Sequence, residues 1–458
     1  MRPNAIKNDL YPLLKLAFPL ILTGMVGASI GFFETVFLAH LSKEAMAAGA
    51  LVSWLFGVFI VIIFGTLSSI NVLIAHKHGA QDERGISRVL RDGLILAVFL
   101  SIPAIFLFWN MAPIFLLFGQ EPSMVKLAEP YLHALTWGLL PTFIFAALNQ
   151  LIIGLGHGRL VMIFTTFSVL FALFFSFALI FGKFAMPALG ISGAGWGIVI
   201  SDWIMVFLSS TYLMTNKRYQ VYVKHIFQLD KPFYIWELLK VGLPMGVMYC
   251  FEVGFFFALT LMMGSLSPQL LAANQIALQY MGTLMGVIFS VAQAVTVRMG
   301  HLIGAHDILA AKRTNYAGLS ISITFMSLIA VIYWLCPNLL ISIDLDVNNP
   351  ENSSIVHYAK QLLYVSAVFQ LFEATRITLF GALRALKDTH FTLVSSIISF
   401  WGIAFPIGYL LLTQFNMGGA GLWAGMAIGA CFSMSVLIWR FNSKIHAKID
   451  TPIVQAKD

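Results

Sequence analysis

Long apolar stretches separated by short polar segments run along the whole chain. Each stretch is about 20 residues or longer, which is the length an α-helix needs to cross the hydrocarbon core of a bilayer. We expect membrane-spanning helices at residues 12–40, 51–75, 93–118, 129–155, 161–184, 190–214, 235–263, 276–299, 316–343, 357–383, 391–414 and 418–440. These stretches are far longer than the roughly 10-residue alternating strands of a membrane barrel. The pattern therefore predicts an all-α polytopic membrane protein with twelve transmembrane helices.

Composition and charge agree with this prediction. The 458 residues are 59% hydrophobic and only 10% charged, whereas soluble domains carry about 25% charged residues. The net charge of +7 is spread as Lys and Arg on alternate loops, so it indicates membrane topology rather than nucleic-acid binding. Basic residues concentrate in cytoplasmic loops of membrane proteins. We therefore expect both termini in the cytoplasm.

The second half of the chain repeats the first. The segment "LLKLAFPL" at 13–20 matches "LLKVGLPM" at 238–245, and "LSKEAMAA" at 41–48 matches "LSPQLLAA" at 266–273. Six spans per half give both halves the same orientation, so a pseudo-two-fold axis along the membrane normal should relate them. We expect an N-terminal lobe at 1–214, a cytoplasmic linker at 215–233, a C-terminal lobe at 234–441 and a tail at 442–458. Repeats of this kind are typical of transporters with sites near the bilayer midplane.

Acidic residues inside the predicted spans are the main functional candidates. A charged side chain at the bilayer centre costs at least about 2.5–3.5 kcal/mol on insertion scales. Four acids carry this cost: Glu34, Asp202, Glu252 and Glu373.

Glu252 is the strongest of these candidates, because it lies midway along its predicted helix, eight residues after Pro244. The residues one helical turn away carry no positive charge; they are Met248, Tyr249, Phe255 and Phe256. Desolvation should therefore favour the protonated carboxyl, so that a proton can load and leave near neutral pH. The alternative is a permanently protonated glutamic acid that only bridges two helices.

Glu373 has Arg376 one helical turn further on, where their side chains can meet. The pair is either a structural lock or a built-in counter-ion that rearranges when a cation binds. Glu34 lies near the end of its helix, where a partly solvated cap is the alternative to a functional acid. For Asp202 we expect a polar contact between two helices.

Motifs of soluble enzymes and nucleotide sites are absent from the sequence. No GxxxxGK[ST] segment occurs, and the glycine-rich "GLGHGR" at 154–159 does not belong to a strand–loop–helix unit. The three cysteines fit neither a disulfide framework nor a metal site. We therefore expect neither an enzyme, nor an ATP site, nor a cofactor.

Several segments resemble the multidrug and toxic compound extrusion (MATE) transporters, in particular the bacterial NorM-type branch. They are "FPLILTGM" with "ETVFLAHLS", "GAQDERGISRVLRDGL", "GLPMGVMYCFEVGFFF", "LAANQIALQ" and "FQLFEATRITLFGALRALKDT". The resemblance implies two six-helix lobes arranged as a V around a central cavity. It also implies export of cationic aromatic compounds against entry of Na⁺ or H⁺. Glu252, Glu373 and Glu34 match the family's acids implicated in coupling. Supporting roles are expected for Arg376, Asp202, Tyr249, Gln275 and Gln370.

The chain departs from the family pattern in its N-terminal lobe. Ala172 and Ser176 stand where the family usually has two asparagines, and Ile198 stands where it has a threonine. Because a bare Na⁺ needs several oxygen ligands, we expect coupling to centre on Glu252 and Glu373. We expect H⁺ ahead of Na⁺ as the coupling ion, with Na⁺ at these two acids as the alternative.

The predicted function is cation-coupled multidrug efflux by alternating access, carried out by a monomer in the bacterial inner membrane. The expected partners are drug or dye cations and membrane lipids, and no nucleic acid. The alternatives are a lipid-linked oligosaccharide flippase of the same superfamily and another twelve-helix metabolite carrier. A flippase would require several intramembrane Arg or Lys residues for pyrophosphate, whereas only Arg376 lies clearly within a helix core.

Overall fold

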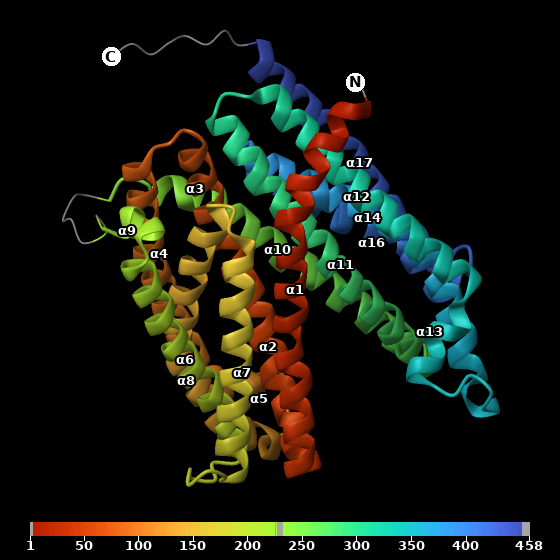
Figure 1. The fold of residues 1–458 in the computed structure, drawn as a ribbon. Helices are drawn as coiled ribbons and strands as arrows, with labels where there is room; N and C mark the ends of the chain where they lie inside the picture. Colours follow the sequence, from red (N-terminus) through yellow and green to blue (C-terminus); the bar gives the residue numbers. More distant parts are fainter. Residues whose placement is uncertain (1–2, 225, 227–231, 451–458) are drawn as a thin grey trace. The chain divides into compact units, whose positions relative to one another are not determined.

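The computed structural model describes residues 3–224, 226 and 232–450, and all regular structure among them is helical (Figure 1). Twelve helical segments in this part of the chain are long and apolar enough to cross a membrane, which confirms the predicted all-α, twelve-span fold. The first half contains α1 (Pro3–Leu41), α2 (Lys43–Leu67), α3 (Ser69–Gly79), α4 (Glu83–Trp109), α5 (Met111–Leu117), α6 (Pro122–Gly154), α7 (Gly158–Phe181), α8 (Ile191–Thr215) and α9 (Lys217–Val223). The second half contains α10 (Ile235–Leu266), α11 (Pro268–Gly304), α12 (Ile308–Leu335), α13 (Pro337–Asp344), the 3₁₀ turn η1 (Pro350–Asn352), α14 (Ser353–Ala385), α15 (Thr389–Ile397), the π-helix η2 (Ile398–Ala404), α16 (Phe405–Thr413) and α17 (Gly418–Asp450).

Several helices extend beyond their predicted ends into polar sequence. The third span begins at Glu83 rather than at residue 93, and the last helix continues to Asp450, through part of the predicted tail. Hydropathy misses these turns because their residues are charged, although side-chain caps and tertiary packing still favour a helix. Arg84 and Arg88, which precede the predicted span and belong to the basic residues expected in loops, therefore lie on α4. The predicted linker holds the short helix α9, while its Lys231 lies outside the described residues.

The two halves use the same helix caps, which gives the sequence repeat a physical basis. The Ser42 hydroxyl accepts a hydrogen bond from the Ala45 amide, and 225 residues later Ser267 caps α11 in the same way. Asp82 and Asp307, which are also 225 residues apart, cap α4 and α12. Such caps contribute about 1 kcal/mol each by satisfying a helix-terminal N–H.

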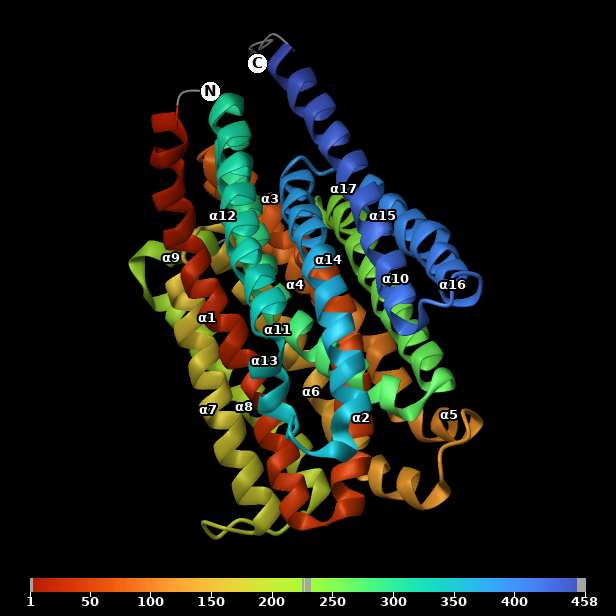
Figure 2. The same ribbon diagram turned by 90° about the vertical axis from the view of Figure 1, so that its right-hand side faces the viewer.

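One helix at the centre of each half carries much of the buried surface. α6 packs against α2, α3, α4 and α8 (Figure 1), and α14 packs against α11, α12 and α17 (Figure 2). These two helices are the most buried of the twelve spans. They correspond in the repeat, since Gly154 near the end of α6 pairs with Gly381 near the end of α14. Polar side chains on α6 and α14 are therefore held inside the protein.

The chain forms two compact units whose boundaries differ from those of the predicted lobes. The first unit is Phe18–Gly246, and the second unit joins Met1–Ala17 to Val247–Asp458. The start of α10 belongs to the first unit, where Ser68 contacts the Met245 sulfur at 3.7 Å. The start of α1 belongs to the second unit, where Leu13 packs beside Gly318 of α12. Each half therefore gives the beginning of its opening helix to the other half's unit.

Candidate functional site

A buried arginine in the second unit joins the two acids that the sequence analysis ranked first. From α14, Arg376 donates through Nη1 to Glu252 Oε1 of α10 at 2.8 Å. It donates through Nε to Glu373 Oε2 at 2.8 Å, and its Nη2 contacts the other oxygen of Glu373. The Arg376 side chain is only 1% exposed. Glu373 therefore pairs with Arg376, a contact that the sequence left open, and the ion pair extends to Glu252.

Ser396 of α15 completes this group, which we name the Arg376 cluster: Glu252, Glu373, Arg376 and Ser396. The Ser396 hydroxyl donates to Glu252 Oε1 at 2.5 Å and accepts from Arg376 Nη1 at 3.2 Å. The neighbours of Glu252 on its own helix carry no positive charge, as the sequence shows, but they are not its only neighbours. The balancing charge comes from Arg376 on α14, so Glu252 is not an acid without a counter-ion.

Aromatic rings enclose the guanidinium of Arg376. The rings of Phe380 and Phe400 have their centroids 4.5 and 4.7 Å from its central carbon. Cation–π contacts of this kind are worth about 2 kcal/mol or more when they are desolvated. The two rings also keep water away from the ion pairs, and this strengthens the electrostatic interactions within the cluster.

A π-helix lies directly beside the Arg376 cluster. It spans Ile398–Ala404 and begins two residues after Ser396. Within this segment, Phe400 lies against Arg376, and the Trp401 indole donates to the carbonyl of Phe251, the residue before Glu252, at 3.0 Å. Short π segments inside α-helices are frequent at functional sites.

Besides Arg376, three predicted supporting residues of the second unit lie in different surroundings. Tyr249, one turn before Glu252, accepts a hydrogen bond from Arg384, whose guanidinium also lies 5.5 Å from the tyrosine ring centroid. Gln370 is buried one turn before Glu373 and donates to Ser366 at 2.7 Å. Gln275 is exposed on α11, so the structure does not bring it to the Arg376 cluster. Its neighbour Asn274 is the buried residue and accepts from Trp423.

The first unit holds its two predicted acids apart from each other, each against a hydroxyl group of α6. Glu34 is 4% exposed and accepts from the Tyr131 hydroxyl at 3.4 Å, while its Oε1 is buried and has no hydrogen-bond partner among the described residues. It is therefore not a solvated cap. Asp202 of α8 contacts the hydroxyl of Thr142 on α6, which is the expected polar contact between helices.

Asp92 is a buried acid that the sequence analysis did not single out. It lies on α4, fully buried, and accepts from the backbone amides of Phe233 and Tyr234 at 2.7 and 2.6 Å and from Arg91 at 3.0 Å. These bonds fix the chain just before α10 begins. Asp92 preceded the predicted start of its span at residue 93, so it was not counted as an intramembrane acid.

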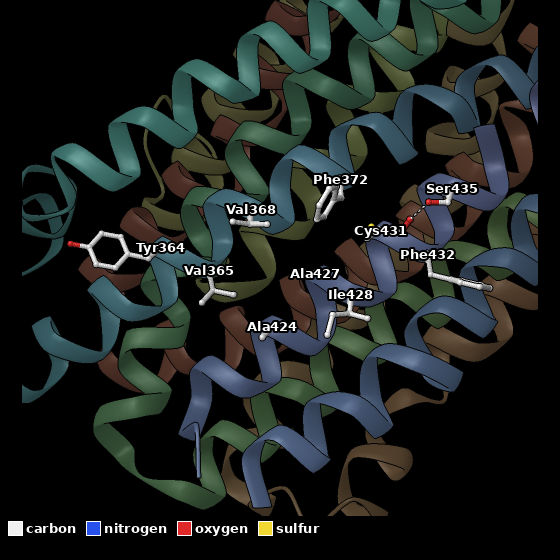
Figure 3. A pocket seen from close by; sticks show the side chains of 10 residues that line it. All are labelled: Tyr364, Val365, Val368, Phe372, Ala424, Ala427, Ile428, Cys431, Phe432 and Ser435. Carbon is white, nitrogen blue, oxygen red and sulfur yellow. Dashed lines mark hydrogen bonds between the residues drawn. The ribbon is translucent and has the colours of Figure 1, made fainter. Parts of the chain in front are cut away.

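An apolar groove of about 720 Å³ lies between α14 and α17 of the second unit. Figure 3 shows Val368 and Phe372 of α14 facing Ala427 and Ile428 of α17. None of its lining residues belongs to the Arg376 cluster, although Phe372 directly precedes Glu373. The described residues contain no group of three or more His, Cys, Asp or Glu side chains suited to hold a metal ion.

Comparison with known proteins connects this architecture to one family. The MatE family model matches residues 19–178 and 244–410, which is one match in each half. A probable multidrug resistance protein NorM from Synechocystis is 30% identical over 97% of this chain and 96% of its own length. A multidrug resistance protein NorM from Burkholderia vietnamiensis is 30% identical over 98% of this chain and 97% of its own.

Solved structures show the same fold at lower sequence identity. The eukaryotic MATE transporter AtDTX14 has a TM-score of 0.83 at 18% identity, with 97% of this chain and 99% of that chain covered. An outward-facing multidrug resistance MATE transporter of the MOP superfamily has a TM-score of 0.86 at 17% identity, with 97% of both chains covered. The chain is therefore a multi-pass membrane protein that belongs to the MATE transporter family, in its bacterial NorM-type branch.

Proposed function

We propose that this transporter exports cationic aromatic compounds in exchange for H⁺, with the Arg376 cluster as the exchange site. The observation that carries the proposal is the charge of the cluster. Two carboxylates, Glu252 and Glu373, share one guanidinium, so the buried cluster has one negative charge in excess when both acids are ionised. An uncompensated buried charge is costly, and either a proton or an organic cation would neutralise it.

The hydrogen bonds of the cluster single out one atom for this exchange. Both oxygens of Glu373 and Oε1 of Glu252 accept from Arg376 or Ser396. Glu252 Oε2 accepts no hydrogen bond from the described residues, and the Glu252 side chain is 10% exposed. This oxygen is the position where a proton can bind without breaking an existing contact.

The same geometry favours H⁺ over Na⁺. A sodium ion needs several oxygen ligands, and three of the four carboxylate oxygens in the cluster already bind the guanidinium or the serine. Recruiting them for Na⁺ would require Arg376 to leave, whereas a proton needs only Glu252 Oε2. Exchange follows because a proton and a cationic drug compete for the same excess charge, with unequal affinity in the inward- and outward-facing states.

The test is dye efflux from everted vesicles that contain the full chain, under an imposed pH gradient or an imposed Na⁺ gradient. We expect efflux with the pH gradient alone and its loss in Glu252→Gln, while the exposed Glu121→Gln control keeps wild-type efflux. Efflux driven only by Na⁺ would overturn the choice of ion. Wild-type efflux by Glu252→Gln would overturn the site.

Location in the cell membrane with both termini in the cytoplasm is part of the proposal and is supported by the alternation of basic loops. Reporter fusions at both ends would test the orientation. Export of a lipid-linked oligosaccharide is disfavoured, because Arg376 is fully engaged with two carboxylates and is not available to bind pyrophosphate.

A further inference from the structure

Asp202 is a buried acid that has no role in the proposed exchange, and it lies at the middle of its membrane span. It is the twelfth of the 25 residues of α8 and is 7% exposed. A carboxylate with a single hydroxyl partner at such a position is costly, because the charge loses its water without gaining a counter-ion.

The hydrogen bonds around Thr142 indicate which group supplies the shared proton. The Thr142 hydroxyl lies 2.7 Å from the Gly138 carbonyl and also contacts Asp202 Oδ2. A hydroxyl has one proton and can therefore donate to only one of these two acceptors. Both contacts are satisfied together when Asp202 is a neutral carboxylic acid that donates to Thr142, which in turn donates to Gly138.

Among the residues that the structure describes, no charged side chain faces Asp202 from the helices packed on α8. On α6 the titratable residues Lys126, Glu129, Tyr131 and His133 all precede Thr142 by at least nine residues, or about 14 Å along the helix. On α7 the only one is Arg159, nine residues before Ser168, whose carbonyl contacts Ser201 of α8. On α8 itself the only one besides Asp202 is Tyr212, ten residues later. The titratable residues of α9 begin with Lys217, fifteen residues after Asp202.

The repeat shows that the fold does not require this polar pair. At an offset of 227 residues Thr142 corresponds to Phe369, and at an offset of 226 Asp202 corresponds to Ile428. The second half thus has apolar residues at both corresponding positions. A structural contact alone would not explain an acid that costs free energy where its repeat counterpart is isoleucine.

A proline next to Thr142 gives α6 a weak point at the same depth. Pro141 lies inside the helix and has no N–H to donate to the carbonyl of Trp137. Bending at this point would separate Thr142 from Asp202 and admit water to the carboxyl. A bend at Pro141 would therefore change the environment of the acid.

We propose that Asp202 is a second proton-binding site, in the first compact unit and independent of the Arg376 cluster. The carboxyl holds one proton in the conformation described here and releases it to water, leaving a carboxylate, when α6 bends away from α8. The release of this proton during transport rests on the proposed function, whereas the presence of a proton on Asp202 in this conformation does not.

Infrared difference spectroscopy of the purified full chain tests the bound proton without any transport assay. A pH jump to alkaline values should remove a protonated-carboxyl band in the wild type, and that band should be missing in Asp202→Asn. Thr142→Val keeps the acid and removes its partner, so the band should remain and move to the frequency of a free carboxyl. A wild-type spectrum in Asp202→Asn, or an unmoved band in Thr142→Val, would overturn the assignment.

Proton counting in proteoliposomes then tests the role in transport. Asp202→Asn should export dye with one proton fewer per cycle, while Glu252→Gln should not export at all. An unchanged proton count in Asp202→Asn would overturn the coupling role. Export by Glu252→Gln would instead overturn the proposed function, while the infrared result for Asp202 would still stand.

Discussion

Replacing Arg376 with methionine is the most informative perturbation of the buried cluster. Methionine keeps much of the side-chain volume between Phe380 and Phe400 but removes the charge that both carboxylates share. At an effective dielectric constant of 20, two unit charges 2.8 Å apart attract each other by about 6 kcal/mol. Most of this attraction offsets the desolvation of three charged groups. Removing one partner of a buried ion pair therefore costs about 3–5 kcal/mol.

The expected result is a large loss of stability that further neutral substitutions reverse. We expect Arg376→Met to be destabilised by about 3–5 kcal/mol, because two facing carboxylates remain without a cation. Adding Glu373→Gln should recover part of this loss, and adding Glu252→Gln as well should recover most of it. Thermal unfolding in detergent measures all three variants, and the coupling energies follow from double-mutant cycles.

A matched control separates loss of the cluster from a general effect of removing a positive charge. Lys126→Met removes an exposed cation on α6 and should change stability by no more than about 0.5 kcal/mol. If Arg376→Met unfolds like the wild type, or if adding Glu373→Gln to Arg376→Met lowers its stability further, the description of Arg376 as the shared counter-ion of two buried carboxylates is refuted.

Three further predictions concern positions away from the cluster. Burial and the nearby positive Arg218 lower the pKa of His157, in the α6–α7 turn, to about 4. As the pH drops, His157 therefore binds a proton in the unfolded chain before it does so in the folded protein, and stability should fall between about pH 6.5 and pH 4. His157→Gln should reduce this loss, which thermal scans at a series of pH values can measure. A Cβ at Gly425 would lie 2.6 Å from the Ala404 carbonyl, so Gly425→Ala should cost about 1–3 kcal/mol, whereas Gly286→Ala, with open space around it, should not. Trp423→Phe should lower the free energy of unfolding by about 1–3 kcal/mol, because the buried side-chain oxygen of Asn274 loses its indole donor. Chemical denaturation can measure this loss.

Hydropathy and self-comparison predicted the number of spans and the repeat because both depend on local sequence. Glu252 on α10 was recognised as a candidate because an acid inside a membrane span is costly. Arg376 on α14 was considered as a partner of Glu373 alone, because these two residues lie three positions apart on one helix. The contact between Arg376 and Glu252 joins residues 124 positions apart, and no periodicity reports such a contact.

Register explains the remaining differences between sequence and structure. Gln275 was selected from a motif, but a helix turns by 100° per residue, so its neighbour Asn274 is the one that faces the protein interior. Ser396 was not predicted because serine is common in membrane helices and gives no signal of its own. Asp92 was missed by a single residue at a predicted boundary.

The exchange of opening helices between the two compact units means that neither half of the duplicated chain is self-sufficient. A fragment ending at residue 224 would lack the start of α10, including Met245, which contacts Ser68. A fragment starting at residue 232 would lack Leu13, which packs beside Gly318. Each fragment would expose the packing site that the start of the other half's opening helix normally fills, as in domain-swapped proteins. Two separately synthesised halves should therefore become functional only by mutual complementation, and a tandem gene guarantees that the two partners are made in equal amounts.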